Sequence, residues 1–150
     1  MKRRNWPAVL LIVLAVFSSS ILFAQETRTY INGRSAADEN VPPFSGAVLV
    51  GDTLYLSGSI GLEDGKVPDE PGDEARIVMN SIKGNIEAAG MTMDDIVYIQ
   101  VFCSDVRHYQ AFNEVYRTFF TKEFPARAFI GVGTLLANAR FEVQGIAVKR

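Results

Sequence analysis

A short, nearly unbroken apolar run places the strongest constraint on the fold. Residues Ile96–Cys103 read I-V-Y-I-Q-V-F-C, and Gln100 is the one clearly polar residue among them. A run of this length indicates a β-strand, and the lack of polar alternation indicates burial on both faces. The chain has 150 residues, enough for one packed domain. Its own helices can cover one face of a sheet, so we expect another subunit to cover the second.

Two amphipathic helices are predicted, one before and one after this strand. Apolar residues recur at helical spacing over Ala75–Ala89 and again over Phe112–Phe119. Asp73 is placed to cap the first helix, and Gly90 to end it in the left-handed conformation. Pro125 stops the second helix, because the residue before a proline avoids the helical region.

The apolar segments of the N-terminal half are predicted as strands. Thr27–Ile31 forms a short strand, and Ala47–Val50 and Thr53–Ser57 form a hairpin around Gly51-Asp52. Gly58 is expected to close the last of these strands. Together with the helices, this order predicts a single α+β domain in which two helices cover one face of a mixed sheet.

The C-terminal quarter supplies two more alternating segments and a pair of opposite charges. The segments run from Phe124 to Thr134 and from Arg140 to Val148, and we predict that they form a hairpin with Asn138 in its link. Such a hairpin would set Arg127 opposite Glu142, which lies fifteen positions later.

Arg127 and Glu142 admit two interpretations. The planar donors of a guanidinium match a substrate carboxylate, and a nearby glutamate can polarise a water, so the pair is half of a hydrolytic site. Alternatively, the pair is a cross-strand salt bridge, which contributes under about 1 kcal/mol where it is exposed. The two residues alone do not decide between these interpretations.

The N-terminus has the pattern of a secretory signal peptide. The basic residues of Lys2–Arg4 precede an apolar run over Ala8–Phe17, and Ala24 is the first choice for the residue before the cleaved bond, with Ser20 as the second. This predicts a signal peptide over residues 1–24, a mature domain over 25–150, and export to the periplasm. The alternative is an uncleaved membrane anchor over Pro7–Ala24. A lipoprotein is disfavoured, since no cysteine stands near the cleavage region.

Composition argues against several classes of function. The chain has 15 basic and 17 acidic residues, so we expect no nucleic-acid partner. The one cysteine, Cys103, cannot form an intramolecular disulfide and is predicted to be a strand residue, not a nucleophile. With the one histidine, His108, it offers too few ligands for a metal site.

Short motifs along the chain resemble the RidA (YjgF-like) family of reactive-intermediate deaminases. They are P-P-F-S-G-A-V around Phe44, L-Y-L-S-G-S-I around Gly58, N-I-E-A-A-G before Met91, A-F-N-E-V-Y-R-T-F-F around Asn113, and F-P-A-R followed by F-E-V-Q-G-I-A-V at the end. The resemblance spans nearly all of Val41–Arg150, and the order and spacing of the motifs make it specific.

The resemblance implies a chorismate-mutase-like α+β fold, a homotrimer with active sites in the clefts between subunits, and no metal or organic cofactor. It implies hydrolysis of enamines and imines such as 2-aminoacrylate to 2-keto acids and ammonia. At the matching positions, Arg127 would hold the substrate carboxylate and Glu142 would orient the attacking water. Ser57, Gly58 and Asn113 match positions that line or support the cleft.

The chain also departs from the family pattern. Phe44 stands where the family commonly has tyrosine, Phe129 where many members have cysteine or threonine, and Gln144 where they have a second glutamate. Because Arg127 and Glu142 are kept, we expect retained activity with an altered pocket, in which Phe44 and Phe129 contact the substrate.

The expected partners are a small imino or keto acid and further copies of the chain, with no membrane contact after signal cleavage. Two other functions remain open. A non-catalytic trimer that binds small carboxylates would keep Arg127 without needing Glu142. A stress-related interaction or chaperone-like module would need exposed apolar surface beyond the cleft.

Overall fold

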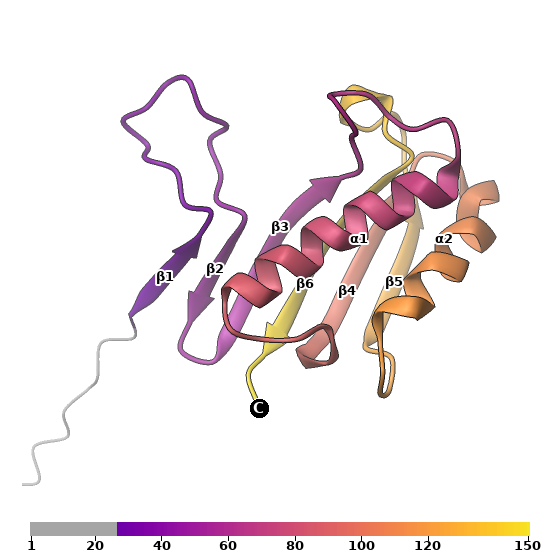
Figure 1. Ribbon diagram of the computed structural model, residues 1–150. Helices are drawn as coiled ribbons and strands as arrows, with labels where there is room; N and C mark the ends of the chain where they lie inside the picture. The colour runs from indigo at the N-terminus through magenta and orange to yellow at the C-terminus, as the bar shows by residue number, and fades with distance from the viewer. Residues whose placement is uncertain (1–26) are drawn as a thin grey trace, which may run out of the picture.

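The computed structural model describes residues 27–150, so the predicted signal peptide over residues 1–24 lies outside the described residues. One sheet of six strands and two α-helices make up this part of the chain (Figure 1). The elements in order are β1 (Arg28–Ile31), β2 (Ala47–Val50), β3 (Thr53–Ile60), α1 (Pro71–Ala88), β4 (Ile96–Cys103), α2 (Tyr109–Tyr116), β5 (Ala126–Gly131) and β6 (Phe141–Val148).

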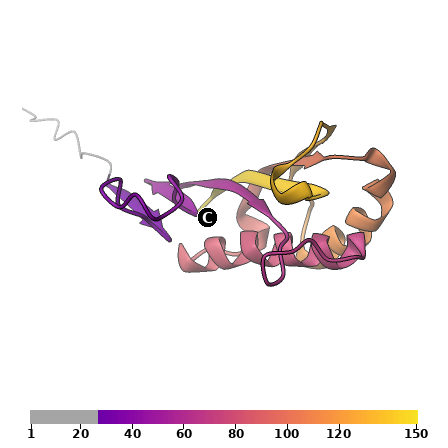
Figure 2. The ribbon, with the colours of Figure 1, turned by 90° about the horizontal axis from the view of Figure 1, so that it is seen from above.

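Both helices pack on the same face of the sheet (Figure 2). The core lies between the sheet and the two helices. Its fully buried side chains are Leu54, Val78, Met79, Ile82, Ile86, Ile99, Val101, Phe112, Phe141 and Val143. This confirms the predicted α+β architecture with two helices on one face.

The strand order is β1-β2-β3-β6-β4-β5. All neighbouring strands are antiparallel except β4 and β5, which are parallel. The predicted C-terminal hairpin is therefore wrong, because β6 pairs with β3 and β4, and β5 forms the edge of the sheet. A parallel pair needs a crossover, and α2 supplies it between β4 and β5. The alternation along β5 and β6 indicated strands without indicating their neighbours.

The other face of the sheet carries apolar side chains that no helix covers. Tyr55, Tyr98 and Ile130 are exposed there, and Ile146 lies between the two tyrosines in the register of the strands. The chain itself therefore buries only half of the side chains of β4. Cover of the second face by another subunit stays a prediction.

Two predicted element ends are wrong. The first helix begins at Pro71 after an extended Glu70, so Asp73 lies in its first turn and is not the N-cap. Proline fits the first helical position, where its missing N–H is no loss. Gly58 does not close its strand either, since β3 continues to Ile60 with a register shift between Leu56 and Ser59. By contrast, Gly90 has the predicted left-handed conformation, with φ of 73°.

The helices of residues 27–150 are all too short or too polar to cross a membrane.

Candidate active site

Arg127 lies on the edge strand β5 and points toward α2. Its Nη1 donates a hydrogen bond of 2.8 Å to Oδ1 of Asn113, and its Nη2 lies 3.4 Å from the hydroxyl of Tyr109. The ring of Tyr116 has its centroid 4.6 Å from the guanidinium carbon. Within residues 27–150 Arg127 forms no ion pair. Neutral groups therefore hold the guanidinium in place and leave its charge available to an anion.

Phe129 packs beneath this arrangement and supports it. Its ring contacts that of Tyr109 edge to face, with centroids 4.9 Å apart, and lies 5.7 Å from that of Phe112 in the core. Such pairs stabilise a fixed ring orientation. Phe129 is not among the residues that line the neighbouring cavity. Its place in the structure is that of a support for Tyr109 and Arg127.

A cavity of about 250 Å³ opens beside Arg127. It is lined by Tyr109, Asn113, Tyr116, Arg117, Phe124, Pro125 and Arg127. The lining includes two guanidinium groups and no carboxylate, so the cavity favours an anionic ligand. Burial raises the pKa of Tyr116 to about 12, against a smaller opposing effect of Arg127. Tyr116 is therefore a neutral phenol at neutral pH and does not act as a base.

Glu142 lies on β6 and points to the other face of the sheet. Phe141 and Val143 are fully buried under the helices, so alternation along the strand turns Glu142 away from them. A Cβ atom at Gly58 would collide with Oε1 of Glu142. Only glycine at this place leaves room for the carboxylate as it lies in the structure.

Ser57 and Phe44 accompany Glu142 and Gly58. The Oγ of Ser57 donates a hydrogen bond of 2.7 Å to the carbonyl of Ser45, the residue after Phe44. Phe44 is 53% exposed, and the guanidinium of Arg34 lies 5.1 Å from the centroid of its ring. The loop that carries Phe44 is thus tied to β3 next to Gly58.

The predicted site residues therefore form two groups. Arg127, Asn113 and Phe129 lie together on the helix side of β5, and Glu142, Gly58, Ser57 and Phe44 form the second group. Along β4, Arg127 stands beside Ile99 and Glu142 stands beside Phe102. Figure 1 shows β5 and β6 on either side of β4. A single chain does not bring Arg127 and Glu142 together, so the predicted cross-strand pairing of these two residues is wrong.

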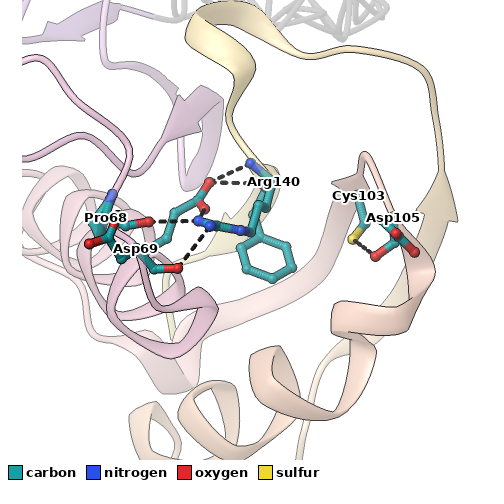
Figure 3. A network of polar contacts seen from close by, with 7 residues as sticks. Pro68, Asp69, Cys103, Asp105 and Arg140 are labelled. Carbon is teal, nitrogen blue, oxygen red and sulfur yellow. Dashed lines mark hydrogen bonds and ion pairs between the residues drawn. The ribbon is translucent and has the colours of Figure 1, made fainter.

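A buried ion pair fixes the start of β6. Glu74 of α1 is fully buried and accepts hydrogen bonds of 2.6 Å from the backbone N of Arg140 and 3.1 Å from that of Phe141. Its carboxylate lies 2.9 Å from Nη1 of Arg140. The Arg140 guanidinium also donates to the carbonyls of Pro68 and Asp69, as Figure 3 shows. This network could not be predicted from the sequence, because Glu74 follows an acidic loop and nothing in the local pattern indicates that it is buried.

Cys103 is a buried strand residue, as predicted. Its Sγ lies 3.0 Å from the carbonyl oxygen of Asp105 (Figure 3). Burial raises the pKa of the thiol. A raised pKa disfavours the thiolate that a nucleophile needs.

In the part of the chain from residue 27 on, the structure has no group of three or more His, Cys, Asp or Glu that could hold a metal ion.

Comparison with known proteins identifies the family. The family model described as endoribonuclease L-PSP matches residues 35–149. A 2-iminobutanoate/2-iminopropanoate deaminase of Dermatophagoides farinae is 38% identical over 75% of this chain and 90% of its own length. The chain belongs to the RidA (YjgF-like) family.

Other members of the RidA family agree in sequence and fold. The 2-iminobutanoate/2-iminopropanoate deaminase of Escherichia coli K12 is 33% identical over 78% of this chain and 98% of its own length. The crystal structure of the YjgF gene product of E. coli has a TM-score of 0.69 at 33% identity, covering 79% of this chain and all of that one. E. coli TdcF with bound serine has a TM-score of 0.72 at 28% identity, with 81% of this chain covered.

Proposed function

We propose that this protein hydrolyses 2-imino acids to 2-keto acids and ammonia. The observation that carries the proposal is the guanidinium of Arg127, which is held by the neutral acceptor Asn113 and faces a cavity without acidic lining. The deaminase names of its RidA relatives support the same reaction. An anion site alone would bind any small carboxylate. The groups that hydrolyse the imine must therefore come from the second set of residues, which includes Glu142.

Glu142 suits the hydrolytic step. The carbon of an imine is already electrophilic, so the enzyme needs to position the substrate and deliver water. In the proposed reaction the carboxylate of Glu142 accepts a proton from the water as its oxygen bonds to the imine carbon. The same proton then reaches nitrogen, which gives a carbinolamine. The carboxylate next takes the hydroxyl proton and passes it to nitrogen, so the carbon–nitrogen bond breaks and ammonia leaves as the carbonyl group of the 2-keto acid forms.

The proposed site combines two subunits. Arg127 and Glu142 face opposite sides of the sheet, so one chain presents each residue to a different neighbour. In a homotrimer, every cleft would receive Arg127 from one subunit and Glu142 from the next. The exposed apolar side chains on the open face, such as Tyr55 and Tyr98, supply a surface for this contact.

We also propose that the protein is exported. The support is the sequence of residues 1–24, which has a basic start and a short apolar run. N-terminal sequencing of the protein from a periplasmic fraction should begin near Gln25. A chain that keeps Met1 in the membrane fraction would establish the anchor instead.

Ammonia release from freshly generated 2-iminobutanoate tests the reaction. The purified protein should accelerate release, and Arg127→Ala should abolish the acceleration. Glu142→Gln separates the enzyme from a non-catalytic carboxylate-binding protein, because only the enzyme needs that carboxylate. If wild type and both variants release ammonia at the rate of buffer alone, the proposed function is wrong.

A further inference from the structure

The cavity beside Arg127 has aromatic walls at its mouth. Tyr109 is 45% exposed and Phe124 is 58% exposed, although both are large apolar side chains. Tyr116 also lines the cavity, and its ring stacks on that of Phe124 with centroids 6.1 Å apart. Exposed aromatic rings around a cavity are typical of a surface that binds another apolar or aromatic group.

The volume of the cavity exceeds what a small imine fills. It measures about 250 Å³, which is roughly eight times the share of one water molecule in the liquid. It lies just below the range of about 300–1,000 Å³ that holds drug-sized ligands. With its carboxylate on Arg127, 2-aminoacrylate would leave much of this space to water, whereas an aromatic side chain would occupy it.

The positive charge of the cavity determines which chemical group the ligand carries at its other end. Arg117 and Arg127 both line it, and within residues 27–150 neither forms an ion pair. Arg127 is the fixed one of the two, because Asn113 holds its Nη1. A ligand that fits these features carries a carboxylate at one end and an aromatic ring at the other.

We propose that the preferred substrates are 2-imino acids with aromatic side chains, a proposal that rests on the proposed deaminase function. The carboxylate binds Arg127, and the ring packs against Tyr109, Tyr116 and Phe124. Phe129 contributes by fixing the orientation of the Tyr109 ring through their edge-to-face contact. The bulk of Phe129 thus shapes the aromatic wall without filling the cavity.

The test compares the imines of phenylalanine and alanine, generated in place by an amino-acid oxidase while semicarbazide traps unhydrolysed imine. The protein, expressed from its full gene, should show a kcat/KM at least about tenfold higher for the aromatic imine. Phe124→Ala should lower this preference about tenfold, and Phe124→Tyr, which keeps the ring, should restore it. Leu136→Ala is the control, since Leu136 is 76% exposed and lies outside the cavity.

A second readout needs no catalysis. Calorimetric titration with phenylpyruvate and with pyruvate should show tighter binding of phenylpyruvate, and Phe124→Ala should reduce the difference. Equal kcat/KM values for the two imines, or a preference that Phe124→Ala leaves unchanged, would overturn this inference while the deaminase function stands. Hydrolysis of neither imine would overturn the proposed function, and the titration would then still decide what the cavity binds.

Discussion

Arg127 and Glu142 lie on opposite faces of one sheet, separated by strand β4 and offset along it from Ile99 to Phe102. The two residues that the proposed reaction needs most are thus unable to meet within one chain. Under the proposed function, the active site would therefore form only between subunits of the assembly. It also gives each residue a role that can be tested separately.

Substitution of Arg127 by lysine should weaken binding more than turnover. Lysine keeps the positive charge but loses the planar pair of donors, at a cost of roughly 1.5–3 kcal/mol in carboxylate binding. The affinity for 2-keto acids, measured by calorimetry, should fall accordingly, whereas Glu142→Gln should chiefly lower kcat. Arg76→Lys on the exposed side of α1 is the matched control. Unchanged affinity in Arg127→Lys would remove Arg127 from the site.

Gly58→Ala should impair turnover with little effect on the fold. The new Cβ would meet Oε1 of Glu142 and displace the carboxylate, and a misplacement of this kind lowers kcat by up to about a hundredfold. Gly84→Ala is the control, because a Cβ there meets nothing within 4 Å and should stabilise α1 by about 0.5–1 kcal/mol. Full kcat in Gly58→Ala would show that the position of Glu142 does not matter.

Glu74→Ala should be strongly destabilising. It leaves the mostly buried guanidinium of Arg140 without its carboxylate, which costs about 3–5 kcal/mol in the free energy of unfolding. Urea denaturation measures this change. The exposed pair Lys83 and Glu87 provides the comparison, since Glu87→Ala should change the free energy by under about 0.5 kcal/mol. Equal effects of the two substitutions would contradict the structural role of Glu74.

Stability should fall in alkaline solution because of Tyr116. The pKa of its buried phenol is raised from 10.0 to about 12, so above pH 10 the unfolded chain loses the proton and the folded chain keeps it. The free energy of unfolding should therefore decrease as pH rises from 10 to about 12. Tyr116→Phe should show a smaller decrease, and it removes a buried hydroxyl that has no hydrogen-bond partner. Identical pH profiles for the two proteins would contradict the raised pKa.

The positions of the main elements could be predicted from local pattern. The run Ile96–Cys103 forms a strand with the predicted bounds, and the helical periodicity of Ala75–Ala89 and Phe112–Phe119 corresponds to α1 and to α2 with the turn that follows it. Apolar periodicity depends only on the residues within one helix or strand, so it can be recognised before the neighbours of that element are known.

The pairing of the strands could not be predicted in the same way. Phe141 and Val143 bury equally well beside any strand that faces the helices, so their alternation does not choose between β5 and β3 as a neighbour. The crossover through α2 decides, because it makes β5 parallel to β4 and leaves the other side of β4 to β6.

Candidate site residues could be named from the sequence, but their arrangement in space could not. Arg127 and Glu142 were singled out as opposite charges on two predicted strands, and the resemblance to the RidA family implied their roles. Which face of the sheet each residue occupies follows only from the strand pairing. Glu74 gave no signal at all, because a buried glutamate and a solvated one look alike in sequence.

A mixed-subunit experiment tests the shared site most directly. Arg127→Ala and Glu142→Gln chains, each inactive alone, are co-expressed with different tags, and assemblies that contain both are isolated. If every site takes Arg127 from one subunit and Glu142 from its neighbour, each mixed trimer regains one intact site of its three, and imine hydrolysis should recover to about a third of the wild-type rate. Mixed assemblies that remain as inactive as the single variants would contradict the account.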